Sequence, residues 1–355
     1  MKFFKSLSCL CTVLGLLVFL TGCPKPAHKA ESKGMVYFTY FDTVSYIYSY
    51  AGDSNEEFEA NCNAVAAVLG EYHRLFDIYH EYSGVTNLCT LNSLAGADWT
   101  QVDEKLIDFL LYAKELYAKT NGEMNIMLGS LLRIWHDSRE AASSDPASAY
   151  VPETAVLDEA ERHTSIDLLE IDKEAGAVRI SDPEASIDVG ALGKGYATEI
   201  AARLLYEMGV SGYVLNIGGN IRIIGEKNDG SGWNTGIKNP QNPETYANYI
   251  TISDTSCVTS GNYERYFTLD GVRYHHIIDK DTLMPAEYFS SVTVVTPNSG
   301  LADALSTALF CMDYESGVKI AESFDGVHVL WILPDGTQLM TEGMRSLLTE
   351  KAPET

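Results

Sequence analysis

The stretch SIDVGALGKGYA, residues 186–197, joins a short apolar run to three closely spaced glycines and then to helix-forming residues. The pattern predicts a strand over residues 186–189, a glycine-rich turn over residues 190–195 and a helix over residues 194–208. Glycines let the backbone approach a ligand closely, amides at a helix N-terminus face outward, and Lys194 adds a positive charge. The stretch therefore suits a phosphate group.

The same stretch does not match the known phosphate-binding fingerprints. The spacing from Gly190 to Lys194 is too short for a Walker A loop, and Gly195 stands where a Ser or Thr would hold the metal. It does not fit the dinucleotide fingerprint either. A tight strand-to-helix connection with a solvated lysine explains the stretch equally well, so other segments must decide.

Two further turns of similar style lie in the C-terminal half of the chain. Residues 215–220, LNIGGN, and residues 258–265, VTSGNYER, place glycines and polar side chains directly after apolar strands. Each could be an ordinary hairpin turn, or could hydrogen-bond a nucleotide. The presence of three such turns in one half of the chain favours a nucleotide site.

Two pairs of side chains could carry chemistry. Asp303 and Thr307 are four residues apart in an apolar helical pattern, so they share one face of the expected helix. Hard oxygen ligands of this kind suit Mg²⁺, although a first-turn helix charge and a packing threonine would give the same spacing. His275 and His276 end an expected strand, where such a pair is more often structural than catalytic.

Hydrophobic patterning indicates an α+β fold, because strands and helices alternate irregularly. Aromatic and β-branched residues predict strand structure over residues 35–50, and helical spacing predicts helices over residues 56–75 and 103–120. Residues 137–150 are rich in Ala, Ser and Asp, which indicates a surface excursion and the best candidate for disorder.

The N-terminus has the order of an export signal. Lys2 and Lys5 precede an apolar run over residues 10–20, and Leu-Thr-Gly leads to Cys23. We expect residues 1–22 to be a lipoprotein signal peptide, Cys23 to be lipidated, and residues 23–34 to be a tether. The protein would then be exported and lipid-anchored to the cell membrane, facing the extracytoplasmic side. An ordinary signal peptide with an incidental cysteine is the alternative.

The charge balance restricts the partners of the protein. Lys and Arg total 25 against 49 Asp and Glu, giving a formal net charge of −24. This balance argues against nucleic acid or an anionic membrane surface as a partner, and a polyphosphate ligand would need local cations. Of the seven cysteines, Cys62, Cys89, Cys257 and Cys311 lie beyond the predicted anchor, and no pair has a metal-like spacing.

Taken together, these segments resemble the ApbE-type FAD:protein FMN transferases, a family of exported bacterial lipoproteins. Residues 186–197, 213–225, 257–267 and 291–310 carry the resemblance, with looser support from residues 75–92 and 122–135. It implies one large domain over residues 35–350, built from mixed, mainly antiparallel sheets with packed helices. It also implies Mg²⁺-dependent cleavage of the substrate FAD, release of AMP, and transfer of FMN to a Thr or Ser hydroxyl of a target protein.

The resemblance assigns roles to individual residues. Ala191, through its carbonyl, would bind the metal together with Asp303 and Thr307, and Asp303 would be catalytic. Lys194 and Asp188 would contact FAD, and His276 would orient or deprotonate the incoming hydroxyl. The remaining expected contacts of the flavin nucleotide are Phe41, Tyr79, Glu123, Met124, Asn125 and Ile277.

Three residues depart from the family pattern. Asn125 stands where Asp is common, Lys280 where Pro is usual, and Glu199 where Asp is frequent. Asn125 removes a negative charge, which puts the flavin contacts expected there in question.

The same site could serve a Mg²⁺-dependent FAD pyrophosphatase, which hydrolyses FAD to FMN and AMP, or a lipoprotein that binds flavin without chemistry.

Overall fold

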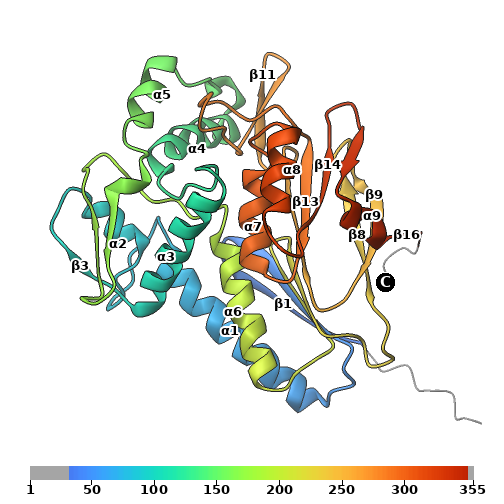
Figure 1. Cartoon of the computed structure of the whole chain (residues 1–355). Helices are drawn as coiled ribbons and strands as arrows, with labels where there is room; N and C mark the ends of the chain where they lie inside the picture. Colours follow the sequence, from blue (N-terminus) through green and yellow to red (C-terminus); the bar gives the residue numbers. More distant parts are fainter. Residues whose placement is uncertain (1–31, 351–355) are drawn as a thin grey trace, which may run out of the picture. The chain divides into compact units, whose positions relative to one another are not determined.

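The computed structural model describes residues 32–350. An eight-stranded sheet runs through it in the order β1-β2-β6-β7-β10-β13-β14-β15, and every neighbouring pair is antiparallel. Figure 1 shows this sheet with helices packed in front of it. Its strands are β1 Lys33–Tyr40, β2 Thr43–Ser49, β6 Tyr213–Ile217, β7 Asn220–Ile224, β10 Ser256–Gly261, β13 Ser291–Thr296, β14 His328–Ile332 and β15 Gln338–Met340.

Three smaller sheets complete the strand structure of the described residues, again with antiparallel pairing. Their orders are β16-β9-β8, β3-β5-β4 and β11-β12. The expected α+β fold with mainly antiparallel sheets is therefore confirmed. The strands are β3 Thr100–Gln101, β4 Leu169–Asp172, β5 Ala177–Ile180, β8 Trp233–Asn239, β9 Asn242–Ile252, β11 Tyr266–Leu269, β12 Val272–His275 and β16 Leu348–Thr349.

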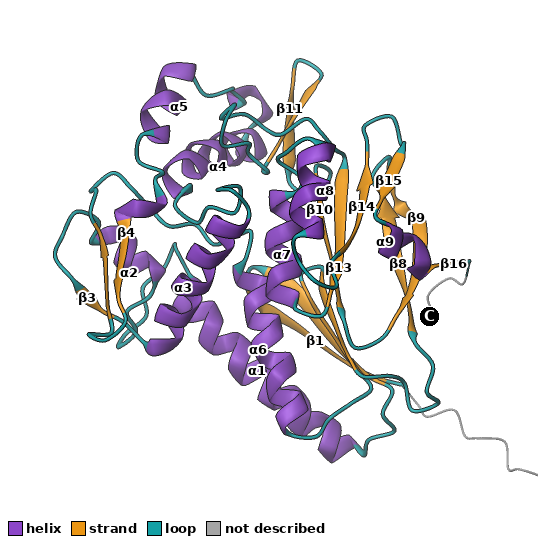
Figure 2. Ribbon diagram, viewed as in Figure 1, coloured by secondary structure: helices purple, strands orange, loops and turns teal. Residues whose placement is uncertain are grey.

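Helices cover one face of the large sheet and build a second group beside it (Figure 2). Helices α6 and α7 pack on each other and on the central strands, and α1 packs along α6. None of the helices in the described part is long and apolar enough to cross a membrane. They are α1 Asn55–Phe76, α2 Leu88–Ser93, α3 Glu104–Lys119, α4 Gly129–Ser144, α5 Thr154–Glu161, α6 Gly193–Glu207, α7 Ser299–Ala308, α8 Tyr314–Glu322 and α9 Glu342–Leu347.

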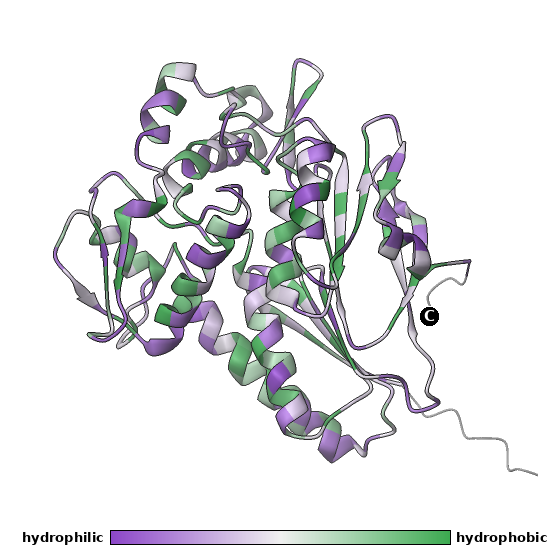
Figure 3. Ribbon diagram, viewed as in Figure 1, coloured by the Kyte–Doolittle hydropathy of each residue, from purple (hydrophilic) through white to green (hydrophobic). Residues whose placement is uncertain are grey.

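Period-2 alternation places the central strands between two cores. On β14, Val329 and Trp331 contact the helix side, whereas Leu330 and Ile332 pack against the β8–β9 hairpin. Figure 3 shows the resulting apolar colour on β13, β14 and the inner side of α7. Burial on both faces anchors β10 and β13, so the ends of these strands are held rigidly beside α7.

The strand structure predicted over residues 35–50 is confirmed, as an antiparallel hairpin of β1 and β2 in which Phe41 and Asp42 both adopt positive φ and reverse the chain. Three other sequence predictions need correction. Residues 137–150 are not an irregular excursion, since α4 continues to Ser144 and buries Ser138 and Ala142. Strand β1 begins at Lys33, so residues 33 and 34 of the predicted tether lie in the sheet.

The third correction concerns residues 186–189, which are extended but form no strand. The side chain of Asn92 accepts from the Ile187 amide at 2.7 Å and donates to the Ile187 carbonyl at 2.9 Å. The Asp188 amide donates to the Ile126 carbonyl at 2.8 Å. A side chain and a loop thus take the place of a neighbouring strand. The predicted signal peptide and Cys23 lie outside the described residues.

Candidate active site

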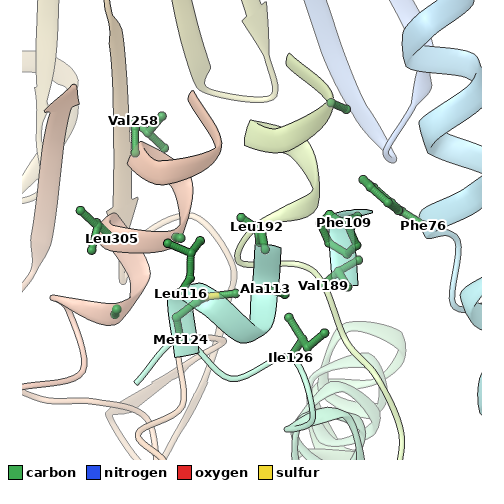
Figure 4. Close-up of a cluster of buried hydrophobic side chains, with 14 of the residues drawn as sticks. Phe76, Phe109, Ala113, Leu116, Met124, Ile126, Val189, Leu192, Val258 and Leu305 are labelled. Atoms are coloured by element: carbon green, nitrogen blue, oxygen red, sulfur yellow. The ribbon is translucent and has the colours of Figure 1, made fainter. Parts of the chain in front are cut away.

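The glycine-rich segment is held by apolar anchors on both sides. Val189 and Leu192 are buried, 6 % and 0 % exposed, in the cluster drawn in Figure 4, while Ala191 between them lines a cavity. Helix α6 then begins at Gly193, close to the expected position. The lysine of this helix, Lys194, donates from Nζ to the Gly190 carbonyl at 3.0 Å. Its side chain therefore stays over the turn.

Gly195 lets helices α6 and α7 approach each other closely. A Cβ atom at this position would lie 2.4 Å from both the Asp303 Cβ and the Ser299 carbonyl oxygen. The Gly195 amide donates to Asp303 Oδ2 at 2.8 Å. Because any larger residue would push α7 away, this glycine fixes the Asp303 carboxylate beside the glycine-rich segment.

Glu199 fixes the start of the helix that carries Asp303. Its carboxylate accepts from the Ser299 amide at 3.0 Å and from Arg222 Nε at 3.3 Å. Arg222 is a residue of β7, so one carboxylate ties α6, α7 and the large sheet together. The departure from the family pattern at Glu199 therefore has a structural role here.

Asp303 and Thr307 lie one turn apart on α7 and line the same cavity as Ala191. Burial raises the pKa of Asp303, while Lys194, the Gly195 amide and the Asn220 side chain oppose the shift. Thr307 Oγ1 is 3.1 Å from Ser260 Oγ, which belongs to β10. A buried carboxylate, a hydroxyl and a backbone carbonyl are all hard oxygen donors, so this donor set fits Mg²⁺.

No group of three or more His, Cys, Asp or Glu side chains in the described part of the chain could hold a metal ion. The expected ligand set is of a different kind, because it contains only one carboxylate. Magnesium commonly takes one or two carboxylates and completes its shell with water and substrate phosphates. The side chains present are compatible with that arrangement.

A second, cationic wall faces the same cavity. His276 Nδ1 lies 3.2 Å from the Arg265 carbonyl, and because a carbonyl only accepts, Nδ1 carries the proton and Nε2 keeps its lone pair. Burial, reinforced by Arg265, His275 and Arg139, lowers the pKa of His276 to about 3. The imidazole is therefore neutral near pH 7.

Sequence reasoning missed Arg139 and His136, which belong to this wall. Both line the cavity, and Arg139 Nη2 lies 2.9 Å from His136 Nδ1. Burial, with Arg265 as the next cause, lowers the pKa of Arg139. The sequence did offer one indication, because His136 and Arg139 are three residues apart and would share one face of a helix. This spacing could be used only if α4 was expected to continue past Trp135.

The expected flavin contacts also line this cavity, whose volume is about 2900 Å³. Phe41 packs edge-on against His73 with ring centroids 5.7 Å apart, and Tyr79 lies 5.7 Å from the His136 ring. Burial raises the pKa of Asp188, which accepts from the Gly190 amide at 2.8 Å. The cavity thus collects every predicted site residue inside the described chain: Phe41, Tyr79, Glu123, Met124, Asn125, Asp188, Ala191, Lys194, His276, Ile277, Asp303 and Thr307.

The two other departures from the family pattern have local explanations. Asn125 donates to the Thr164 carbonyl at 2.9 Å and accepts from the Met127 amide at 2.9 Å, so both ends of its side chain bind backbone. Lys280 Nζ lies 3.3 Å from Glu123 Oε1, at the edge of the cavity. Burial raises the pKa of Glu123, and Lys280 opposes the shift.

A sequence model of the ApbE family matches residues 41–331. The chain belongs to the ApbE family. A relative from Treponema pallidum, described as an FAD:protein FMN transferase, is 34 % identical over 70 % of this chain and 71 % of its own length. A second relative with that description, from Klebsiella pneumoniae, is 27 % identical over 96 % and 95 % of the two chains. The family resemblance inferred from sequence is thereby confirmed.

Solved ApbE structures share the fold. The ApbE protein of Thermotoga maritima superposes with a TM-score of 0.79 at 28 % identity, covering 90 % of this chain and all of that one. The flavin transferase ApbE of Vibrio cholerae gives a TM-score of 0.74 at 25 % identity with the same coverage. The ApbE fold therefore extends over nearly all of the described residues.

Proposed function

We propose that the protein is an FAD:protein FMN transferase that uses Mg²⁺ to transfer FMN to a Thr or Ser hydroxyl, with release of AMP. The carrying observation is the convergence of all predicted site residues of the described chain on one cavity. The shared description of its curated relatives supports the reaction class. A buried oxygen-donor set on one wall and a neutral histidine on the other provide the chemical groups.

The reaction forms one bond and breaks one bond. The acceptor oxygen attacks the phosphorus on the FMN side of the pyrophosphate, and the bond from that phosphorus to the bridging oxygen breaks, so AMP leaves with the bridging oxygen. The hydroxyl proton passes to Nε2 of His276. The Arg265 carbonyl orients this imidazole ring through its contact with Nδ1. Such transfers depend mainly on positioning and charge stabilisation, with little covalent chemistry by the protein.

Asp303, Thr307 and the Ala191 carbonyl would hold Mg²⁺, which supplies charge neutralisation at the pyrophosphate. Lys194 and Arg265 add positive charge in a protein whose formal net charge is −24. The Gly190 carbonyl holds Lys194 Nζ over the glycine-rich turn, where the ammonium group can pair with a phosphate. Phe41 and Tyr79 offer aromatic surface to the flavin ring.

One incubation separates this function from its rivals. The purified protein is mixed with FAD, Mg²⁺ and a candidate acceptor protein, and the products are read by intact mass and chromatography. A mass gain of one FMN on the acceptor supports the transferase. Free FMN and AMP with an unmodified acceptor would indicate a pyrophosphatase, and unchanged FAD would indicate a binding protein.

We also propose that the protein is exported and anchored through a lipid on Cys23. The support is the order of charged, apolar and small residues before that cysteine. Labelling cells with radioactive palmitate tests it. The wild-type chain should take up label and the Cys23→Ser variant should not, whereas equal labelling of both would contradict the anchor.

A further inference from the structure

One face of the large sheet carries tyrosines that no helix within residues 32–350 covers. On β2, Ile47 is fully buried on the side of α1 and α6, so Tyr46 and Tyr48 point to the opposite side. Tyr48 is 38 % exposed. The rings of Tyr46 and Tyr48 are parallel, with centroids 6.0 Å apart and an interplanar angle of 4°. Tyr50, just past the end of the strand, continues the row.

Strand register supplies an apolar floor beside these tyrosines. Tyr48 lies opposite Val214, which lies opposite Ile223 on the next strand. In the neighbouring row, Tyr46 lies opposite Asn216. Cross-strand partners project to the same face of a sheet, so these side chains form one continuous surface.

The β8–β9 hairpin forms a wall over this surface. Trp233 packs edge-on against Tyr50 with ring centroids 4.9 Å apart. Tyr246 lies over Gly236, where an added Cβ would come within 2.5 Å of its ring. Five residues, Tyr46, Tyr48, Tyr50, Trp233 and Tyr246, line the same cavity as the reaction site, and we refer to them as the aromatic groove.

The aromatic groove leads to the Asp303 carboxylate. The Gly218 amide donates to the Val44 carbonyl at 3.2 Å, which places the β6–β7 turn beside the start of β2. The same turn ends at Asn220, whose side chain helps to lower the pKa of Asp303 and lines the same cavity. The row of tyrosines from Tyr50 back along β2 to Tyr46 therefore leads towards the reaction site.

The size of the cavity leaves room for a second occupant. Its volume of about 2900 Å³ is several times the roughly 300–1,000 Å³ of a typical small-molecule site. A dinucleotide would fill only part of it. The aromatic groove lies outside the set of predicted flavin contacts and is open to solvent at Tyr48 and Tyr246, which is 50 % exposed.

We propose that the aromatic groove binds the acceptor polypeptide as an extended segment adjoining the hydroxyl residue, an inference that rests on the proposed transferase function. Alternate residues of a strand repeat about every 7 Å, so the tyrosine row matches alternate side chains of an extended peptide. Tyrosine and tryptophan give rigid, amphipathic contact area at low entropic cost. The peptide would therefore carry apolar side chains at alternate positions on one side of its hydroxyl residue.

The test uses the full chain and a library of short peptides with a central threonine and randomised flanks. Wild type and the double variant Tyr46→Ser/Tyr48→Ser are incubated with FAD and Mg²⁺, and modified peptides are sequenced by mass spectrometry. Tyr288→Ser is the matched control, because Tyr288 is 43 % exposed and lies outside the cavity lining. FAD affinity and acceptor-free FAD turnover are measured for all three proteins.

We expect wild type and the control to enrich alternating apolar residues next to the threonine. The double variant should lose this enrichment and show a KM for the best peptide at least about tenfold higher, with FAD affinity unchanged. If the double variant transfers FMN with the KM and the peptide enrichment of the wild type, the inference about the aromatic groove is overturned, while the proposed function stands. Absence of any transfer by wild type would overturn the proposed function, and the inference with it. A change from dimer to monomer, or lost vesicle binding, with unchanged KM would assign the aromatic groove to another occupant.

Discussion

The two walls of the cavity respond to the same physical cause in opposite directions. On the carboxylate wall, formed by Asp303 and Thr307, burial raises the pKa of the Asp303 carboxyl group. On the cationic wall, formed by His276, Arg265 and Arg139, burial lowers the pKa of His276 and Arg139. Burial disfavours any isolated charge, so the first wall favours a bound cation and the second a bound anion.

The comparison shows how an acidic protein can prepare a site for a pyrophosphate. Each wall alone destabilises its own charges, and a magnesium–pyrophosphate complex placed between them would relieve both. A ligand that binds the folded state in this way also stabilises the fold. The walls can therefore be broken separately, with different expected consequences.

The largest effect is expected from breaking the carboxylate wall. Asp303→Asn keeps an acceptor for the Gly195 amide but removes the negative charge. We expect FMN transfer to fall by about a thousandfold or more, because the cation would lose its only carboxylate ligand. Transfer is measured by intact mass, and the melting temperature without magnesium should stay close to wild type. A variant with wild-type activity would contradict the assignment.

The second effect comes from the cationic wall. His276→Gln retains a polar group but cannot take up a proton, so we expect transfer to fall by about a hundredfold with FAD affinity retained. Because the pKa of His276 is about 3 without ligand, the imidazole is already neutral between pH 6 and pH 8. The FAD affinity of the wild type should therefore be nearly flat over this range. An inflection near pH 6.5 that disappears in the variant would show that His276 is charged in the free protein.

A smaller effect tests how rigidly the carboxylate wall is held. Gly195→Ala would place a Cβ against the Asp303 Cβ and the Ser299 carbonyl, and these atoms cannot move without shifting α7. We expect a loss of about 1–3 kcal/mol in the free energy of unfolding, together with weaker magnesium binding. Chemical denaturation measures the first quantity. Gly317→Ala in α8 is the control, since this glycine has no positive φ and its Cβ would meet other atoms only at 3.5 Å or more, an ordinary contact distance.

The smallest effect concerns His275, the buried neighbour of His276. Burial lowers the pKa of His275 to about 4 from the unfolded value of about 6.5. Between these values the unfolded state binds more protons, so stability is present above pH 6.5 and is lost as pH falls through this window, by at most about 1.4 kcal/mol per pH unit. His275→Gln should reduce this slope. Urea denaturation at several pH values between 4 and 6.5 measures this dependence of stability on pH. A variant with the same dependence as the wild type would refute the assignment to His275.

Sequence reasoning succeeded where local pattern and tertiary structure agree. The glycine-rich turn, the helix that follows it and the shared face of Asp303 and Thr307 are all properties of short segments. It failed where a distant side chain decides the backbone, as Asn92 does for Ile187. It also missed Arg139, because the polar residues in the C-terminal half of α4 resemble a surface loop until the cavity on one side of the helix is known.

The central claim is that a divalent cation, held by Asp303 and Thr307 beside the glycine-rich segment, is required to break FAD at its pyrophosphate. Its most direct test is titration of the metal-free protein with Mg²⁺ while FAD affinity is followed by calorimetry and turnover by AMP release. The account predicts that both rise together and saturate with magnesium, and that neither responds in Asp303→Asn. FAD affinity and turnover that stay constant from zero to saturating Mg²⁺ would contradict it.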